Sequence, residues 1–190
     1  QRAYSFKTTF MTQKIREIIS SSKYESVFMD EDLNEQISFE QNIISRIKKY
    51  YGKTEKELRV QFDVASNSKN VFEILFGKML GIKGKISKTE EFLKAGIVPK
   101  FIRLKQNGKI KESLSFPSFK FKDISSQDFE ESETYEYFTT KKFLFVVFEY
   151  NSKNELCFSH VKLWNMPMVI IEDELRKVYQ ETKRVIKSGK

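Results

Sequence analysis

The residues best suited to chemistry lie in one stretch, where a carboxylate precedes a strand that carries a lysine. Glu91 is followed by a turn at Gly96, and the residues after it predict a strand over residues 97–105 with Lys100 on it. Side chains two positions apart on a strand point to the same face, so a carboxylate at position 98 would converge with Lys100 on one divalent cation and one water. Position 98 is instead valine, which cannot ligate a hard cation because such cations take oxygen ligands. The stretch has the layout of a metal-dependent hydrolytic strand that lacks one ligand.

A purely structural interpretation also fits this stretch, because a strand that follows a glycine turn and carries one lysine occurs in many proteins. The rest of the chain offers little other catalytic chemistry. His160 and Cys157 are the single histidine and the single cysteine, and both lie in a strand pattern where a structural role is expected. Sites built on histidine, and Ser/His or Cys/His catalysis, are therefore not expected. The glycine-rich phosphate-binding motifs are absent from the sequence. A carboxylate-based metal site is the one catalytic option, with Glu91 as its candidate ligand.

The basic residues are concentrated in one segment. The chain has 34 Lys and Arg against 26 Asp and Glu, a net charge of +8. Residues 78–111 hold ten of the basic residues and only two acids, an excess equal to the net charge of the whole chain. Such a segment predicts contacts with nucleic-acid phosphates, although lysines in solvated loops would give the same count.

The apolar runs and the cysteine content of the chain also indicate its cellular compartment. Apolar runs in this sequence stay well short of the ~18 residues that a membrane span requires. A single cysteine cannot form an internal disulfide and fits a reducing environment. We therefore expect a cytoplasmic protein with no membrane partner.

The apolar periodicity predicts one α+β domain, with helices before and after a mixed sheet. Helices are expected over residues 12–20, 38–51, 54 onward, 69–80 and 172–187, and strands over residues 97–105, 110–116, 119–122, 142–150 and 155–164. Thr54 and Glu57 have the spacing of a capping box. The Asn107-Gly108 pair predicts a hairpin turn into the strand over residues 110–116.

Two further segments bear on domain organisation. Residues 123–136 hold six acids and no base, which predicts a solvated loop. The chain begins with Gln-Arg-Ala rather than Met, so a piece of a longer protein is expected. Within it, residues 1–37 are expected to form an arm with one helix, and residues 38–190 the domain itself.

The order and spacing of several short motifs resemble the MutH family over about residues 50–187. The motifs are Tyr51-Gly52-Lys53-Thr54, Glu57-Leu58, Lys69-Asn70 before an apolar helix that ends at Gly81, the stretch from Glu91-Phe92 to Lys100, and Leu163-Trp164-Asn165 before Glu172-Asp173-Glu174-Leu175. The family comprises a mismatch-repair nicking endonuclease and the GATC-cutting type II restriction endonucleases of the Sau-three-A-I type. The chain is most similar to the C-terminal, catalytically degenerate domain of the latter. The resemblance implies a restriction-endonuclease-like fold of the PD-(D/E)xK kind.

The family's active-site positions can be carried over one at a time. Its first metal carboxylate, usually an aspartate, falls on Glu91, and its second falls on Val98, which is a loss. Its lysine falls on Lys100 and is kept, whereas its helix glutamate falls on Gly77, a second loss. Glu73 lies one turn earlier and could stand in for that glutamate. The resemblance thus implies no intact catalytic site and no bound metal, with Glu91 as the one remaining ligand if a metal is held at all.

The resemblance also implies where DNA would be bound. The family's Lys-Gly pair, which approaches DNA, falls on Lys69 and Asn70. Together with the basic segment, the expected DNA-binding residues are Lys69, Asn70, Lys83, Lys85, Lys100, Arg103 and Lys105. The family's base-reading segment after the last helix, an Arg-Pro-Lys-like stretch, has no counterpart in this sequence.

Three functional hypotheses follow. The first is a catalytically inactive, DNA-binding MutH-like domain of a type II restriction endonuclease. It would recognise GATC in double-stranded DNA and act as an allosteric effector of the N-terminal catalytic domain of the same protein. In that case the parent enzyme would use Mg²⁺ and this domain would need no cofactor. The second is an active Mg²⁺-dependent endonuclease that uses Glu91, with Glu73 or another acid as a stand-in for the missing ligand. The third is a protein-interaction domain without enzymatic activity.

Overall fold

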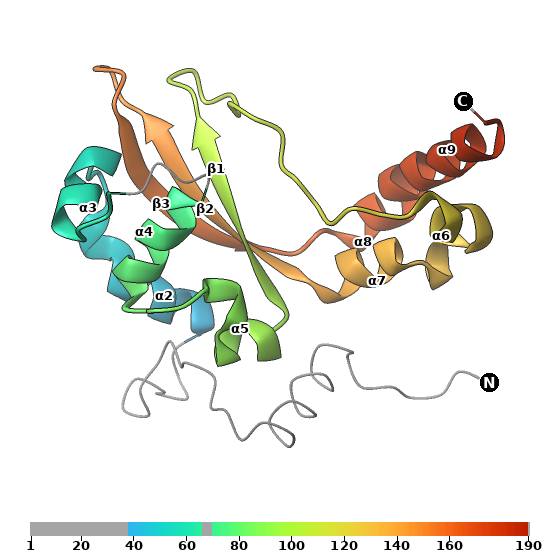
Figure 1. Cartoon of the computed structure of the whole chain (residues 1–190), viewed down its shortest axis with the longest axis horizontal. Helices are drawn as coiled ribbons and strands as arrows, with labels where there is room; N and C mark the ends of the chain where they lie inside the picture. The colour runs from blue at the N-terminus through green and yellow to red at the C-terminus, as the bar shows by residue number, and fades with distance from the viewer. Residues whose placement is uncertain (1–37, 66–69, 190) are drawn as a thin grey trace. The chain divides into compact units, whose positions relative to one another are not determined.

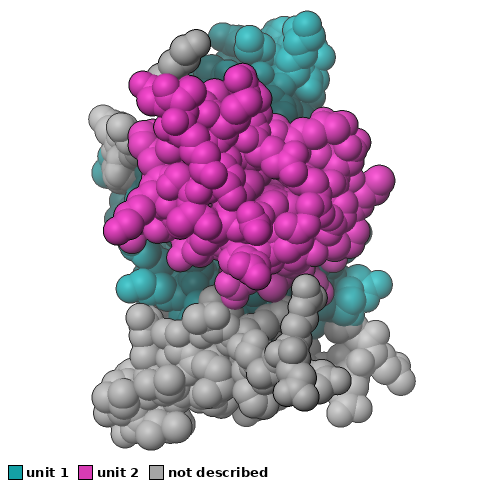
Figure 2. Space-filling model, turned by 90° about the vertical axis from the view of Figure 1, so that its right-hand side faces the viewer, with its two compact units in different colours: residues 1–113, 143–163 teal, residues 114–142, 164–190 magenta. Residues whose placement is uncertain are grey.

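The computed structural model describes residues 38–65 and 70–189 (Figure 1). The helix expected over residues 12–20, the arm expected over residues 1–37 and Lys69 lie outside the described residues. The chain separates into two compact units (Figure 2). Unit 1 comprises Gln1–Ser113 and Phe143–Leu163, and unit 2 comprises Leu114–Lys142 and Trp164–Lys190.

The helices of unit 1 begin and end where the sequence signals predict. Ser38 caps α2 (Phe39–Ile47), which continues as a short 3-10 turn, Lys48–Tyr50. The predicted capping box of Thr54 and Glu57 opens α3 (Glu55–Gln61). The helix α4 (Val71–Leu80) ends at Gly81, whose φ of 79° is the left-handed conformation that glycine adopts without strain. A 3-10 turn (Ile86–Lys88) and α5 (Glu90–Lys94) lead into the sheet.

Three strands form the sheet among the described residues, in the order β1 (Ile97–Leu104), β2 (Lys142–Tyr150) and β3 (Leu156–Trp164). β2 and β3 are joined by the predicted turn over residues 151–154 and are therefore antiparallel. β1 and β2 run in the same direction (Figure 1), and Gln106, just after β1, donates a hydrogen bond to the Asn151 carbonyl just after β2. The predicted α+β class and mixed sheet are confirmed.

The core of unit 1 lies between the helices and one face of the sheet (Figure 1). The central strand β2 contributes Leu144, Val146 and Phe148, all fully buried. From α4, Leu75 and Phe76 are fully buried as well. β2 is buried on both faces, as its continuous apolar sequence predicts.

Two predicted strands are wrong. The Asn107-Gly108 turn forms, with Gly108 at φ 73°, but the returning strand over residues 110–116 reduces to one bridge between Leu104 and Ile110. Residues 119–122 are not a strand, because α6 (Phe121–Ser126) begins within them. A returning strand needs continuous pairing with its neighbour, and a turn signal alone does not supply it.

Unit 2 is helical, and the solvated loop predicted over residues 123–136 is wrong. This segment forms α6, a 3-10 turn (Phe129–Glu131) and the start of α7 (Glu133–Thr140). The closing helix begins earlier than predicted, with α8 (Met168–Ile170) and a π turn (Ile171–Leu175) before α9 (Arg176–Lys187). The small core of the unit consists of Ile124, Phe129, Phe138, Ile171 and Tyr179.

Two acids of this segment, Asp128 and Glu130, form ion pairs with bases of α9. Arg176 forms ion pairs with Glu130 and Glu172, and its guanidinium lies over the Phe129 ring at 5.1 Å from the centroid. Lys183 contacts Asp128 at 3.2 Å. The partners of Asp128 and Glu130 lie about fifty positions away in sequence, beyond the reach of a local count of charge. Across residues 38–65 and 70–189, we find no helix with the length and apolar character needed to cross a bilayer.

Candidate functional site

The strand β1 separates its side chains into two sets. Ile97 and Phe101 pack into the core of unit 1 beneath the helices. Val98 and Lys100 are the alternate residues and therefore point to the opposite face of the sheet. Val98 and Lys100 are two positions apart on β1, so they share one face of the sheet, as the sequence predicts. β1 is also the edge of the three-stranded sheet, a position that tolerates Pro99, which lacks an N–H to donate.

Lys100 is held in a partly dehydrated environment. Its side chain is half-buried on β1, and burial lowers the pKa of its ammonium below the ordinary value. A cation kept where solvation is incomplete costs stability by itself. Such a cation is well placed to gain from contact with an anion, since less of its hydration must be removed on binding.

The two candidate carboxylates, Glu91 and Glu73, lie on different helices. Glu91 is half-buried in α5, a helix that packs against β1, and Glu73 is half-buried in the first turn of α4. Throughout the described part of the chain, no group of three or more His, Cys, Asp or Glu side chains is placed to hold a metal. The arrangement at Val98 and Lys100 offers a cation and an apolar surface to a ligand, with no oxygen from position 98.

Gly77 occupies an apolar place in α4. A Cβ built at this position would lie 3.7 Å from Ile86 Cγ1 and 3.8 Å from the Ile82 carbonyl oxygen, which is ordinary contact. A side chain at position 77 would therefore meet the Ile86 methyl groups. Alanine fits there, whereas a glutamate would place its carboxylate against hydrocarbon.

The expected DNA-binding residues do not share one face. Lys83 and Lys85 are exposed in the loop after α4, and Asn70 is exposed at the start of that helix. Arg103 points to the helix side of β1, because it is three positions from Lys100. Its guanidinium is paired with Glu112 and lies 5.5 Å from the centroid of the Phe72 ring. The hydrogen bond from Glu112 raises the pKa of Arg103, so this cation is already engaged inside the protein.

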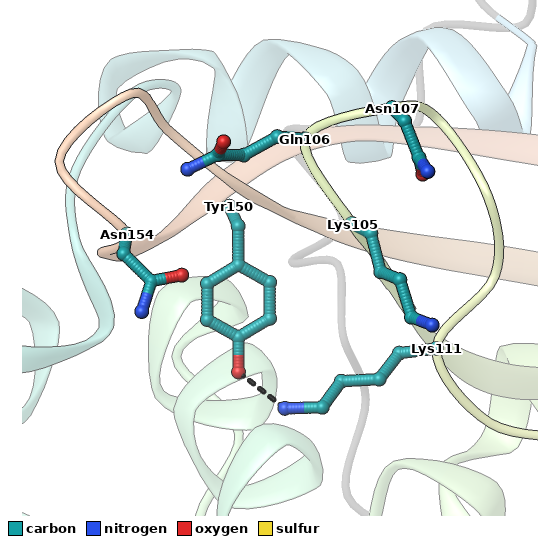
Figure 3. Close-up of a pocket in the computed structure, with 6 residues that line it drawn as sticks. All are labelled: Lys105, Gln106, Asn107, Lys111, Tyr150 and Asn154. Carbon is teal, nitrogen blue, oxygen red and sulfur yellow. Dashed lines mark hydrogen bonds between the residues drawn. The ribbon is translucent and has the colours of Figure 1, made fainter.

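A polar recess lies at the end of the sheet where β1 and β2 finish (Figure 3). It has a volume of about 460 Å³ and is lined by Lys105, Gln106, Asn107, Lys111, Tyr150 and Asn154. Of these, only Lys105 was among the expected DNA-binding residues. The sequence could have indicated the others through the two turns rich in Asn and Lys, but their proximity depends on the parallel pairing of β1 with β2.

His160 and Cys157 lie on β3 and have ordinary surroundings. His160 is exposed, with Nδ1 3.0 Å from the Ser159 hydroxyl. Burial raises the pKa of the Cys157 thiol, which lowers the fraction present as reactive thiolate. Their geometry fits the structural roles expected for both.

Helices around a three-stranded mixed sheet, with a lysine-bearing edge strand, make an architecture compatible with a restriction-endonuclease-like fold. The comparisons with known proteins agree with this class. The chain is similar over its whole length to the type II restriction enzyme Sau3AI of Staphylococcus aureus, with 26% identity over 202 residues. The match covers 100% of this chain and 41% of that protein, so the chain spans about two fifths of the length of its curated relative. No protein-family model matches the chain. The whole-length similarity supports a relationship to type II restriction enzymes.

Proposed function

We propose that this chain is a DNA-binding, catalytically inactive MutH-like domain of a type II restriction endonuclease. The observation that carries the proposal is on β1, where Lys100 is kept and the neighbouring ligand position is Val98. The similarity to a type II restriction enzyme supports a role on DNA. Loss of a carboxylate beside Lys100 favours binding over hydrolysis, since a DNA-facing surface without that charge repels phosphate less.

The proposal extends to the larger protein. In it, this domain would recognise GATC in duplex DNA and act as an allosteric effector of an N-terminal catalytic domain in the same protein. Hydrolysis would belong to that other domain, which would use Mg²⁺, and the present domain would need no cofactor. In the present domain, the role of Glu91 would be structural or electrostatic.

The test is a binding measurement combined with a cleavage measurement. Fluorescence anisotropy is recorded for the 190-residue chain on a labelled GATC duplex and on a scrambled duplex, both with Mg²⁺. The same samples are then run on a denaturing gel. We expect tighter binding to the GATC duplex, strong weakening as salt rises, and intact strands.

Each other outcome points to a different conclusion. Cut strands, with cutting abolished by Glu91→Ala, would show an active endonuclease and overturn the inactive assignment. Equal affinity for both duplexes would contradict recognition of GATC by this chain while retaining DNA binding. Absence of binding at low salt would contradict the proposal as a whole and favour a protein-interaction domain.

A further inference from the structure

We propose that the recess lined by Lys105, Gln106, Asn107, Lys111, Tyr150 and Asn154 is a second DNA contact, which binds a backbone phosphate. The inference rests on the proposed function, because it assumes that the chain binds duplex DNA. It adds a site at the end of the sheet, separate from the β1 face that carries Lys100. Lys105 lies five residues beyond Lys100, a separation of roughly 16 Å along an extended strand.

The recess is built from hydrogen-bond donors. Lys105 and Lys111 bring ammonium groups, and Asn107 and Asn154 bring side-chain amides (Figure 3). The Asn107 Oδ1 accepts a hydrogen bond from the Lys109 N–H at 3.1 Å, so its amide NH₂ is the group left to face outward. A phosphodiester offers two charged oxygens that accept from such donors.

The two loops that form the recess are held in place by the fold. Gln106 donates from Nε2 to the Asn151 carbonyl at 2.6 Å, which ties the loop after β1 to the turn after β2. The backbone N–H of Lys105 donates to the Lys109 carbonyl at 2.8 Å, and that of Lys111 donates to the Arg103 carbonyl at 2.8 Å. The donors are thus presented by a fixed backbone, which reduces the entropy lost on binding.

Lys111 is also positioned by its side chain. Its Nζ donates to the Tyr150 hydroxyl at 2.6 Å and lies 4.6 Å from the centroid of the Tyr150 ring (Figure 3). An exposed lysine normally loses rotamer freedom when it binds a ligand, and this contact has already restricted Lys111. The tyrosine hydroxyl that accepts from Lys111 can donate its own proton to a phosphate oxygen.

The charges around the recess favour an anion. None of the six lining residues is a carboxylate. Glu112 follows Lys111 in sequence, and its carboxylate is paired with Arg103. Two further acids line an adjoining depression that shares Tyr150 and Asn154, and both have partners: Glu55 pairs with Arg59 at 2.7 Å, and Glu155 accepts from Asn151 at 3.1 Å.

The test compares recess lysines with lysines on the same turns that do not line the recess. Lys105→Ala and Lys111→Ala are the test variants, and Lys109→Ala and Lys153→Ala are the matched controls, because all four residues are exposed. Affinity for a labelled duplex is measured across a salt series by anisotropy, and folding is checked by circular dichroism. We expect each test variant to weaken binding several-fold on every duplex sequence and to reduce the salt slope by about 1. The controls are expected to change neither quantity by as much.

Three results would contradict the inference, and they can be told apart. If the wild-type chain binds DNA and all four variants weaken it equally, the lysines act as diffuse charge and the recess is not a site. If the wild-type chain does not bind duplex DNA at low salt, the proposed function fails, and the recess fails with it as a DNA contact. An effect confined to one DNA sequence would also overturn the inference, because a phosphate contact carries no base information.

Discussion

Lys100 lies on the same strand face as Val98 and is half-buried. Burial lowers the pKa of the Lys100 ammonium. The neutral amine is therefore more favoured in the folded chain than it is in the unfolded chain. The resulting stability cost is fully present below the folded pKa and is relieved as the pH rises toward the ordinary value.

We predict that Lys100→Met weakens DNA binding. The substitution removes the cation and keeps a side chain of similar length, and thermal denaturation at pH 7 checks that the fold is retained. The salt slope of binding should fall by about 1. Lys162→Met on β3, an exposed strand lysine, is the control and should affect binding less. A loss of Tm together with unchanged affinity would show that Lys100 is structural.

Val98 allows the charge argument to be tested directly. Val98→Glu would place a carboxylate on the same strand face as Lys100. We predict several-fold weaker DNA binding in EDTA, because the new charge repels phosphate and pairs with Lys100. Mg²⁺ should recover part of the loss. Val98→Gln is the neutral control of similar size, and equal binding by the two variants would contradict the proposal.

At the scale of the element, α4 contains a glycine that its helix does not require. Position 77, where the resemblance would place a glutamate, faces Ile86. Glycine in a helix interior costs roughly 0.5–1 kcal/mol relative to alanine, and nothing at this site compensates with a turn or a positive φ. A carboxylate at position 77 would meet hydrocarbon of Ile86.

We predict that Gly77→Ala stabilises the chain by roughly 0.5–1 kcal/mol. For a protein of this size that corresponds to a rise in Tm of about 2–4 °C per kcal/mol, measured by thermal denaturation. Gly77→Glu should instead destabilise by several kcal/mol, because a buried carboxylate would lack a partner. Gly81→Ala is the contrasting control: its φ of 79° penalises a Cβ, so it should lower Tm. A stable Gly77→Glu variant would show that position 77 does reach a polar site.

At the scale of the whole molecule, the two units depend on different interactions. Unit 1 has a large apolar core, whereas unit 2 has five buried apolar residues and a set of ion pairs centred on Arg176. The hydrogen bond from Arg176 holds the pKa of Glu130 below its ordinary value. Its contribution to stability is present above the unfolded pKa of about 4.5 and is lost as the pH falls through the folded pKa.

We predict that unit 2 loses protection before unit 1 on acidification. Hydrogen exchange, corrected for intrinsic rates, should rise first in α6, α7 and α9 as the pH falls below about 4.5. Glu130→Gln at pH 7 should produce part of the same change in unit 2 and leave the β2 amides unaffected. Simultaneous loss of protection in both units would show that they unfold as one cooperative body.

The sequence by itself determined the local structure of unit 1. Capping at Thr54, the stop at Gly81, the apolar run of β2 and the shared face of Val98 and Lys100 all depend on short-range spacing. Hydrogen bonds at helix ends and the period of two in strands are local properties, so neighbouring residues suffice to predict them. The α+β class followed from the same patterns.

The tertiary structure alone decided which distant residues meet. Residues 123–136 are helical where they bury Ile124 and Phe129, and Phe129 packs against Tyr179 of α9 about fifty residues away in sequence. Lys100 and Arg103 of the basic segment are three positions apart on β1, so their side chains point to opposite faces of the sheet. Arg103 is paired with Glu112. The recess exists because β1 and β2 end side by side, which brings Lys111 to Tyr150. Pairing between strands and helices far apart in sequence costs loop entropy and depends on the whole core, so a local pattern does not specify it.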